Sequence, residues 1–81
     1  MKTHQLKTYP EHFKQILNGS KTFEVRLNDR DFKIGDRLLL MEWSRTKENY
    51  TGRHCLREIT YIMRDGNEFL PLGDMVIMAI K

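Results

Sequence analysis

The chain has few of the residues that stabilise a protein covalently. Cys55 is the only cysteine, so it has no partner for an internal disulfide and forms no Cys-x-x-Cys pair for zinc or redox chemistry. There are only two prolines among 81 residues, and the hydrophobic content of 40% is typical of a folded chain rather than a disordered one. We therefore expect a small hydrophobic core, with Cys55 as one of its strand residues.

Long hydrophobic runs are also missing. The longest run, Leu38–Met41, has the length of a strand, whereas a bilayer-spanning helix needs about 20 apolar residues. Residues Met1–Gln5 lack the apolar stretch of a signal peptide. These features predict a cytoplasmic protein with no membrane partner, and the length predicts a single domain over residues 1–81.

The sequence contains no cluster of metal ligands. The three histidines, His4, His12 and His54, are not at the spacing of a metal site, and a zinc site needs about four ligands. The five methionines are scattered and are best explained as core-filling residues. We therefore predict no metal and no cofactor.

Positive charge is concentrated in the first half of the chain. The net charge is +3, and residues 1–40 hold eight basic and five acidic residues, whereas the second half is balanced. This bias is compatible with an anionic partner such as RNA, and equally with an ordinary solvated surface.

Hydrophobic patterning predicts a mainly β (α+β) fold with one short helix between the first two strands. The helix is expected over residues 10–18, because Pro10 suits a first turn and Asn18-Gly19 is a stop signal. Phe13, Ile16 and Leu17 give it one apolar stripe. The predicted strands are residues 3–8, 21–27, 37–43, 53–63 and 75–80.

Two of these strands are apolar on both faces. Leu38–Met41 predicts an interior strand, and Met75–Ile80 predicts a strand buried on both sides. Five strands in so short a chain favour a small closed or nearly closed β-barrel.

The segment Gly19–Arg26 combines an amine, a hydroxyl, a carboxylate and a guanidinium. In a strand, Thr22, Glu24 and Arg26 would share one face, while Phe23, Val25 and Leu27 would share the other. We expect the apolar face to anchor the core and the polar face to present a site.

These residues resemble those of a known family. Gly19-x-Lys21-x-x-Glu24-x-Arg26 resembles the signature of ASCH domains, which belong to the PUA-like group of small β-barrels. The segment Ile34–Leu40 resembles a strand entry common in that group. His4-x-Leu6-Lys7, Asn28–Phe32 and Tyr50–Arg53 resemble a small bacterial ASCH-like family of undefined function. The resemblance implies a PUA-like barrel of about five strands, with a cleft between barrel and helix that is lined by the Gly19–Arg26 motif.

Three functions follow as expectations. The first is binding of RNA or a modified nucleotide or nucleoside. The second is an amidohydrolase that acts on an acylated cytidine-type nucleoside, with Lys21 and Glu24 as catalytic residues. The chain departs from that enzymatic branch, because Glu24 stands where a threonine is expected. The third is a protein-interaction module whose apolar strand edges bind a partner.

Nine residues are the candidates for the binding site. Lys21 and Arg30 would supply positive charge, and Glu24, oriented by Arg26, would contact a base edge. The other candidates are Lys7, Thr22, Asn28, Tyr50 and Arg53, as phosphate, loop or stacking contacts. Each has a structural alternative, such as an ion pair between strands for Glu24 and Arg26 or a turn bond for Asn28.

Overall fold

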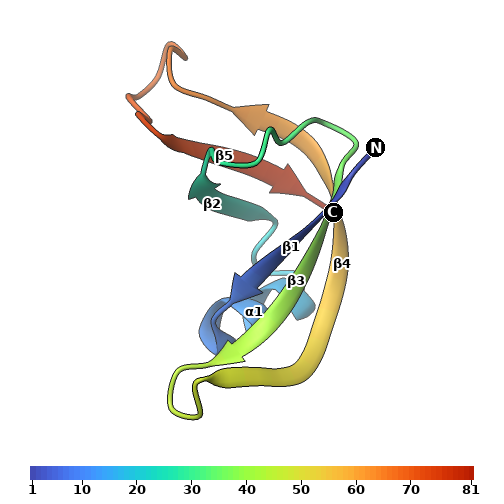
Figure 1. Ribbon diagram of the computed structural model, residues 1–81. Coiled ribbons are helices and arrows are strands. Elements are labelled where there is room, and N and C mark those ends of the chain that lie inside the picture. The colour runs from blue at the N-terminus through green and yellow to red at the C-terminus, as the bar shows by residue number, and fades with distance from the viewer.

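The computed structural model describes all of residues 1–81. It contains five strands and one helix, with the helix between the first two strands as the sequence predicts (Figure 1). The elements are β1 (Thr3–Thr8), α1 (Pro10–Leu17), β2 (Phe23–Leu27), β3 (Arg37–Ser44), β4 (Asn49–Met63) and β5 (Met75–Ile80). The fourth strand begins four residues before its predicted start, because the polar segment that ends in Gly52 continues the ladder with β3.

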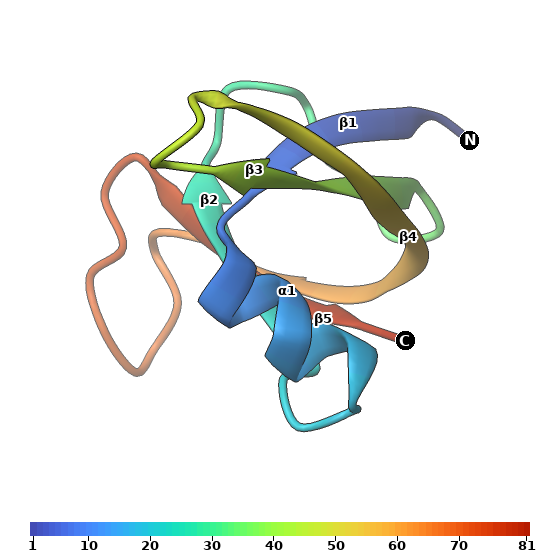
Figure 2. The ribbon, with the colours of Figure 1, turned by 90° about the horizontal axis from the view of Figure 1, so that it is seen from below.

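The strands form one mixed sheet in the order β1-β3-β4-β5-β2. β1 runs parallel to β3, and the other neighbouring pairs are antiparallel. Figure 2 shows the strands curling around a common interior, with α1 across one end. The long strand β4 joins the two halves, and its ladder with β5 shifts register between Ile59 and Tyr61.

The sheet is not closed into the expected barrel. β1 and β2 are its two edges, and no backbone ladder joins them. The side chain of Arg26 on β2 reaches Thr8 on β1 instead, with 3.3 Å between Nη2 and Oγ1. Polar side chains therefore occupy the seam where a closing ladder would lie.

The core lies inside the curl. Leu38 and Leu40 of β3 and Val76 and Met78 of β5 are fully buried there, and Cys55 packs against the cluster as expected. β3 is interior, as predicted. The prediction that β5 is buried on both sides is wrong: Met75, Ile77 and Ala79 are only half-buried, because no element covers their face.

The helix α1 begins with Pro10 and packs against β3. Phe13 and Ile16 are buried, whereas Leu17 is exposed and lies outside the predicted stripe. Gly19 follows with a φ of +82°, a left-handed conformation that glycine adopts without a steric cost. With eight residues α1 is short, and no helix in the structure has the length and hydrophobicity needed to cross a membrane.

Candidate functional site

The strand β2 faces the opposite way from the expectation. Glu24 is only 2% exposed and Arg26 is half-buried, whereas Phe23, Val25 and Leu27 are 47%, 45% and 56% exposed. The alternation was predicted correctly, but the assignment of the apolar face to the core is wrong. A carboxylate can occupy the inner face because cationic partners compensate its loss of hydration.

Three charged side chains meet on this inner face. Lys21 Nζ donates to Glu24 Oε1 over 3.0 Å, and Arg26 Nε donates to Glu24 Oε2 over 2.8 Å. Arg26 also bonds the hydroxyl of Thr8 on β1. We call Lys21, Glu24, Arg26 and Thr8 the Glu24 cluster. Each carboxylate oxygen thus has one cationic donor, and the cluster links the two sheet edges.

The cluster retains donors for a ligand. An ammonium group has three N–H donors, and Lys21 gives one of them to Glu24. Arg26 uses Nε and Nη2, which leaves Nη1 without a protein partner. Two cations and one carboxylate also give a formal charge of +1. Glu24 therefore holds two cations in place, and the bond from Arg26 is the contact by which Arg26 was expected to orient Glu24.

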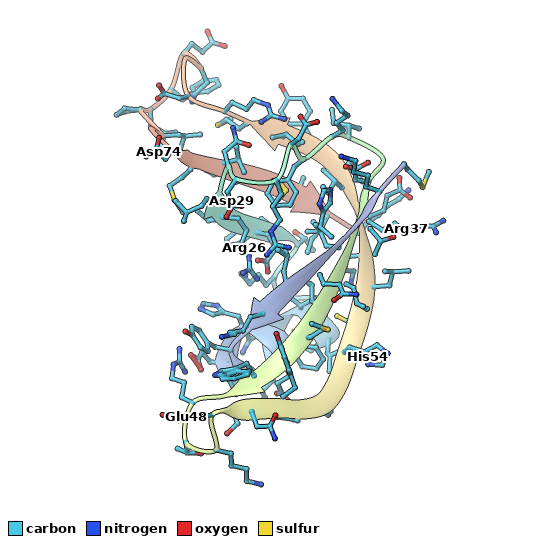
Figure 3. All side chains as sticks on the ribbon, viewed as in Figure 1. Arg26, Asp29, Arg37, Glu48, His54 and Asp74 are labelled. Atoms are coloured by element: carbon cyan, nitrogen blue, oxygen red, sulfur yellow. The ribbon has the colours of Figure 1, made fainter.

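A pocket of about 610 Å³ opens over this cluster. The labelled Arg26 lies between β2 and β1 in Figure 3. The lining comes from the end of β1, the helix α1 and the strand β2, in agreement with the implied position of the cleft. The lining residues are Lys7, Thr8, Tyr9, His12, Gln15, Ser20, Lys21, Phe23, Glu24, Val25 and Arg26.

Two unpaired strand edges form opposite walls of the pocket. The carbonyl of Thr22 accepts from the Ile80 N–H, so the even-numbered residues of β2 pair with β5. The backbone N–H and C=O groups of Phe23 and Val25 therefore point to the free edge. On β1 the carbonyl of Lys2 accepts from Arg37, so the backbone groups of Lys7 point to the free edge as well.

The pocket brings together four of the nine predicted site residues: Lys7, Lys21, Glu24 and Arg26. Thr22 is exposed and does not line it. Asn28 lines a separate small hollow and accepts from Arg64, with 3.2 Å between the atoms.

Three predicted residues have structural contacts elsewhere. Arg30 donates to the Gln5 carbonyl at 2.6 Å and so covers part of the β1 edge. Tyr50 packs edge-on against Trp43, with 4.9 Å between ring centroids. Arg53 donates twice to Glu42, and this guanidinium, followed by the Thr51 hydroxyl, lowers the pKa of Glu42 from its usual value.

Sequence reasoning missed the contribution of the helix. Tyr9, His12 and Gln15 recur every three residues and line the pocket from one side of α1. That polar stripe is visible in the sequence beside the apolar stripe of Phe13 and Ile16. Thr8 and Ser20 gave no comparable signal, because their roles depend on the approach of β1 to β2.

Other reactive groups lie outside this pocket. No group of three histidine, cysteine, aspartate or glutamate side chains is placed to hold a metal ion. Burial raises the pKa of the Cys55 thiol, which disfavours the nucleophilic thiolate. Of the two hollows described, the 610 Å³ pocket is thus the one lined by cationic side chains.

Sequence comparison gives the family. The model of a domain of unknown function, DUF3850, matches residues 3–80. The chain belongs to this family. It is also similar to the "Uncharacterized 12.9 kDa protein in GpA 3'region" of Escherichia phage P2, with 37% identity over 88 residues. That match covers 99% of this chain and 78% of the phage protein.

Proposed function

We propose that this DUF3850 protein binds RNA or a modified nucleotide in the pocket between β1, β2 and α1. The observation that carries the proposal is the Glu24 cluster, which directs spare cationic donors into a pocket between two free strand edges. The ASCH and PUA-like resemblance of the Gly19–Arg26 motif points to the same class of ligand.

The pocket offers three kinds of contact to such a ligand. Lys21 and Arg26 suit phosphate or carbonyl oxygens. The free backbone groups of Phe23, Val25 and Lys7 can pair with the donors and acceptors on a base edge. Tyr9 is a partly exposed lining residue whose ring can stack on a base. The volume is within the range of about 300–1,000 Å³ that is usual for small-molecule sites.

Binding is favoured over hydrolysis by the state of the two catalytic candidates. A general base needs a free lone pair within reach of the substrate proton. Lys21 is a donor to Glu24, and Glu24, whose two oxygens each accept from a cation, is only 2% exposed and out of reach of a substrate proton. The pair therefore resembles a fixed recognition element more than an acid–base couple.

The decisive experiment is a calorimetric titration at low salt with single-stranded RNA, nucleotides and nucleosides, including N4-acetylcytidine. We expect saturable binding by the wild type and at least a tenfold loss of affinity in Lys21→Met. Binding through phosphate contacts should also weaken as salt rises. Absence of binding to every compound at low salt would reject the proposal.

A matched control separates the pocket from general charge. Lys33→Met removes the same charge from an exposed lysine whose one ionic contact is Asp31 at 3.6 Å. We expect this variant to bind like the wild type. Chromatography of the N4-acetylcytidine mixture tests the hydrolase alternative: cytidine formed by the wild type and not by Lys21→Met would establish hydrolysis.

A further inference from the structure

The outer face of β2, β5 and the end of β4 is apolar throughout. Its members form three cross-strand rows, in which each residue pairs with its neighbour by register. The rows are Tyr61–Ala79–Phe23, Met63–Ile77–Val25 and Met75–Leu27. We call these eight residues the apolar face. Figure 1 shows β5 lying between β2 and β4 at this place.

This face is uncovered and carries no charged side chain, and its only polar group is the hydroxyl of Tyr61. Phe23, Val25, Leu27 and Tyr61 are 47%, 45%, 56% and 62% exposed, and the other four members are half-buried. The helix α1 packs mainly against β3 and leaves this face exposed. A contiguous apolar surface of this kind marks an interaction site, whereas scattered exposed hydrophobics do not.

We propose that the apolar face binds the same face of a second copy of this chain, in a two-fold symmetric dimer. A two-fold axis brings a surface against itself, so the surface must be self-complementary. An uncharged face meets this condition without leaving a buried charge unpaired. Two sheet faces packed about 10 Å apart would complete a β-sandwich.

The exposed area fits a weak dimer. With about 200 Å² for a fully exposed large side chain, the four most exposed members present about 400 Å² per copy. The half-buried members and the rim raise the total for two copies toward about 1,200 Å², the lower end of specific interfaces. We therefore expect a dissociation constant in the micromolar range, about 1–100 µM.

The charges at the two ends of the face select the orientation. Asp29 and Asp74 line one small hollow with Leu27; Asp29 lies 3.8 Å from Arg30, and Asp74 has no ionic partner. At the opposite end, Lys81 follows β5, and Lys21, whose Nζ lies 5.3 Å from the Phe23 ring centroid, belongs to the Glu24 cluster with its formal charge of +1. A two-fold axis perpendicular to the strands places the acidic end of one copy near the basic end of the other.

This axis predicts which residues meet. It keeps β2 opposite β2 and reverses the strand direction, so Val25 faces Val25 of the second copy and Leu27 faces Phe23. An axis parallel to the strands would instead place Val25 opposite Met63. Since Phe23 and Val25 also line the pocket, the dimer contact adjoins both pockets.

Analytical ultracentrifugation from about 5 µM to 500 µM tests the dimer. We expect a reversible monomer–dimer equilibrium, and at least a tenfold weaker association for Val25→Lys, which puts a charge in the middle row. Leu56→Lys is the matched control, because Leu56 is 48% exposed on β4 but outside the apolar face. A strictly monomeric wild type, or equal association of both variants, would overturn the proposal, and so would association only with another protein.

Disulfide trapping tests the orientation through the formation of a covalent dimer. This readout is a gain of a product, so a variant that failed to fold could not imitate it. In a Cys55→Ser background, Val25→Cys should form a covalent dimer under mild oxidation, far faster than Leu56→Cys. Leu27→Cys alone should trap poorly, whereas mixing it with Phe23→Cys should give a mixed dimer. Equal trapping at position 56 would contradict the interface. The dimer does not depend on the proposed ligand, because neither experiment contains one.

Discussion

The protein buries three carboxylates against basic partners, and two of them, Asp36 and Glu24, differ in what surrounds them. Asp36 is 3% exposed, accepts from His4 Nε2 at 2.8 Å, and also accepts from the backbone N–H groups of Lys2 and Lys33. We call these groups the Asp36 cluster. Glu24 is equally buried, but its partners are two long cations beside a pocket.

The difference lies in where the remaining hydrogen-bond capacity points. The partners of Asp36 are short or belong to the backbone, and His4 packs edge-on against buried Phe32, with ring centroids 4.7 Å apart. Neither Asp36 nor His4 lines the 610 Å³ pocket or the hollow beside Asn28. The Asp36 cluster thus joins the start of the chain to the turn before β3. The Glu24 cluster keeps free donors beside an open volume. Burial of a carboxylate alone does not distinguish a structural pair from a site.

The largest expected effect is the loss of stability in Asp36→Ala. This change removes three accepted hydrogen bonds and leaves the His4 ring buried without its partner. We expect the free energy of unfolding, measured with urea, to fall by about 3 kcal/mol. Asp29→Ala, which removes an exposed aspartate, is the control and should cost less than about 0.5 kcal/mol. Comparable losses in the two variants would show that the Asp36 cluster does not stabilise the fold more than an exposed aspartate does.

Acid should weaken the same cluster. The hydrogen bond from His4, followed by that from the Lys2 N–H, lowers the pKa of Asp36 from 3.8 to about 2. Because the folded-state pKa is depressed, the contribution is complete above about pH 4 and disappears as the pH falls through about 2. The shift corresponds to about 2 kcal/mol. Urea unfolding between pH 2 and 6 should show this loss in the wild type and not in Asp36→Asn; parallel pH profiles would refute the assignment.

Glu24→Gln should have a smaller effect on stability and a larger one on ligand binding. Glutamine keeps the shape and one acceptor oxygen, but it removes the charge that holds Lys21 and Arg26 in place. We expect a loss of about 1.5 kcal/mol in the free energy of unfolding. We also expect at least a tenfold loss of affinity for the ligand found by titration. Asp36→Asn is the matched comparison, and its folded fraction should bind normally.

The sequence predicted the elements of the fold better than their closure. Periodicity gave all five strands and the helix, because alternation and the Asn18-Gly19 stop are local signals. It did not give the open seam between β1 and β2. Whether the two edges pair depends on how Arg26 and Thr8 are placed relative to one another. These residues are 18 positions apart, and no local sequence pattern predicts their contact.

The site was partly predictable for the same reason. Glu24 and Arg26 were found from strand alternation and Lys21 from the resemblance of its motif, and the three side chains do meet in space. The direction in which β2 faces was wrong, because hydrophobicity alone assigns Phe23, Val25 and Leu27 to a core. Pairing by two cations allows Glu24 inside, and an uncovered sheet face leaves the three apolar residues outside.

The smallest expected effect on stability is that of Lys21→Met. Glu24 keeps Arg26 as a partner at 2.8 Å, and the methionine chain retains most of the packing of the lysine stem. We expect a change of at most about 1 kcal/mol in the free energy of unfolding, measured with urea beside Lys33→Met.

Lys21→Met should thus lose little stability and at least tenfold in ligand affinity. Asp36→Ala should show the reverse, a large loss of stability and little direct effect on ligand binding. A residue that costs little stability and much affinity belongs to a site, because its interactions are completed by the ligand. If Lys21→Met instead lowered the free energy of unfolding as much as Asp36→Ala, the role of the Glu24 cluster would be to stabilise the fold. The pocket would then lose its main support as a binding site.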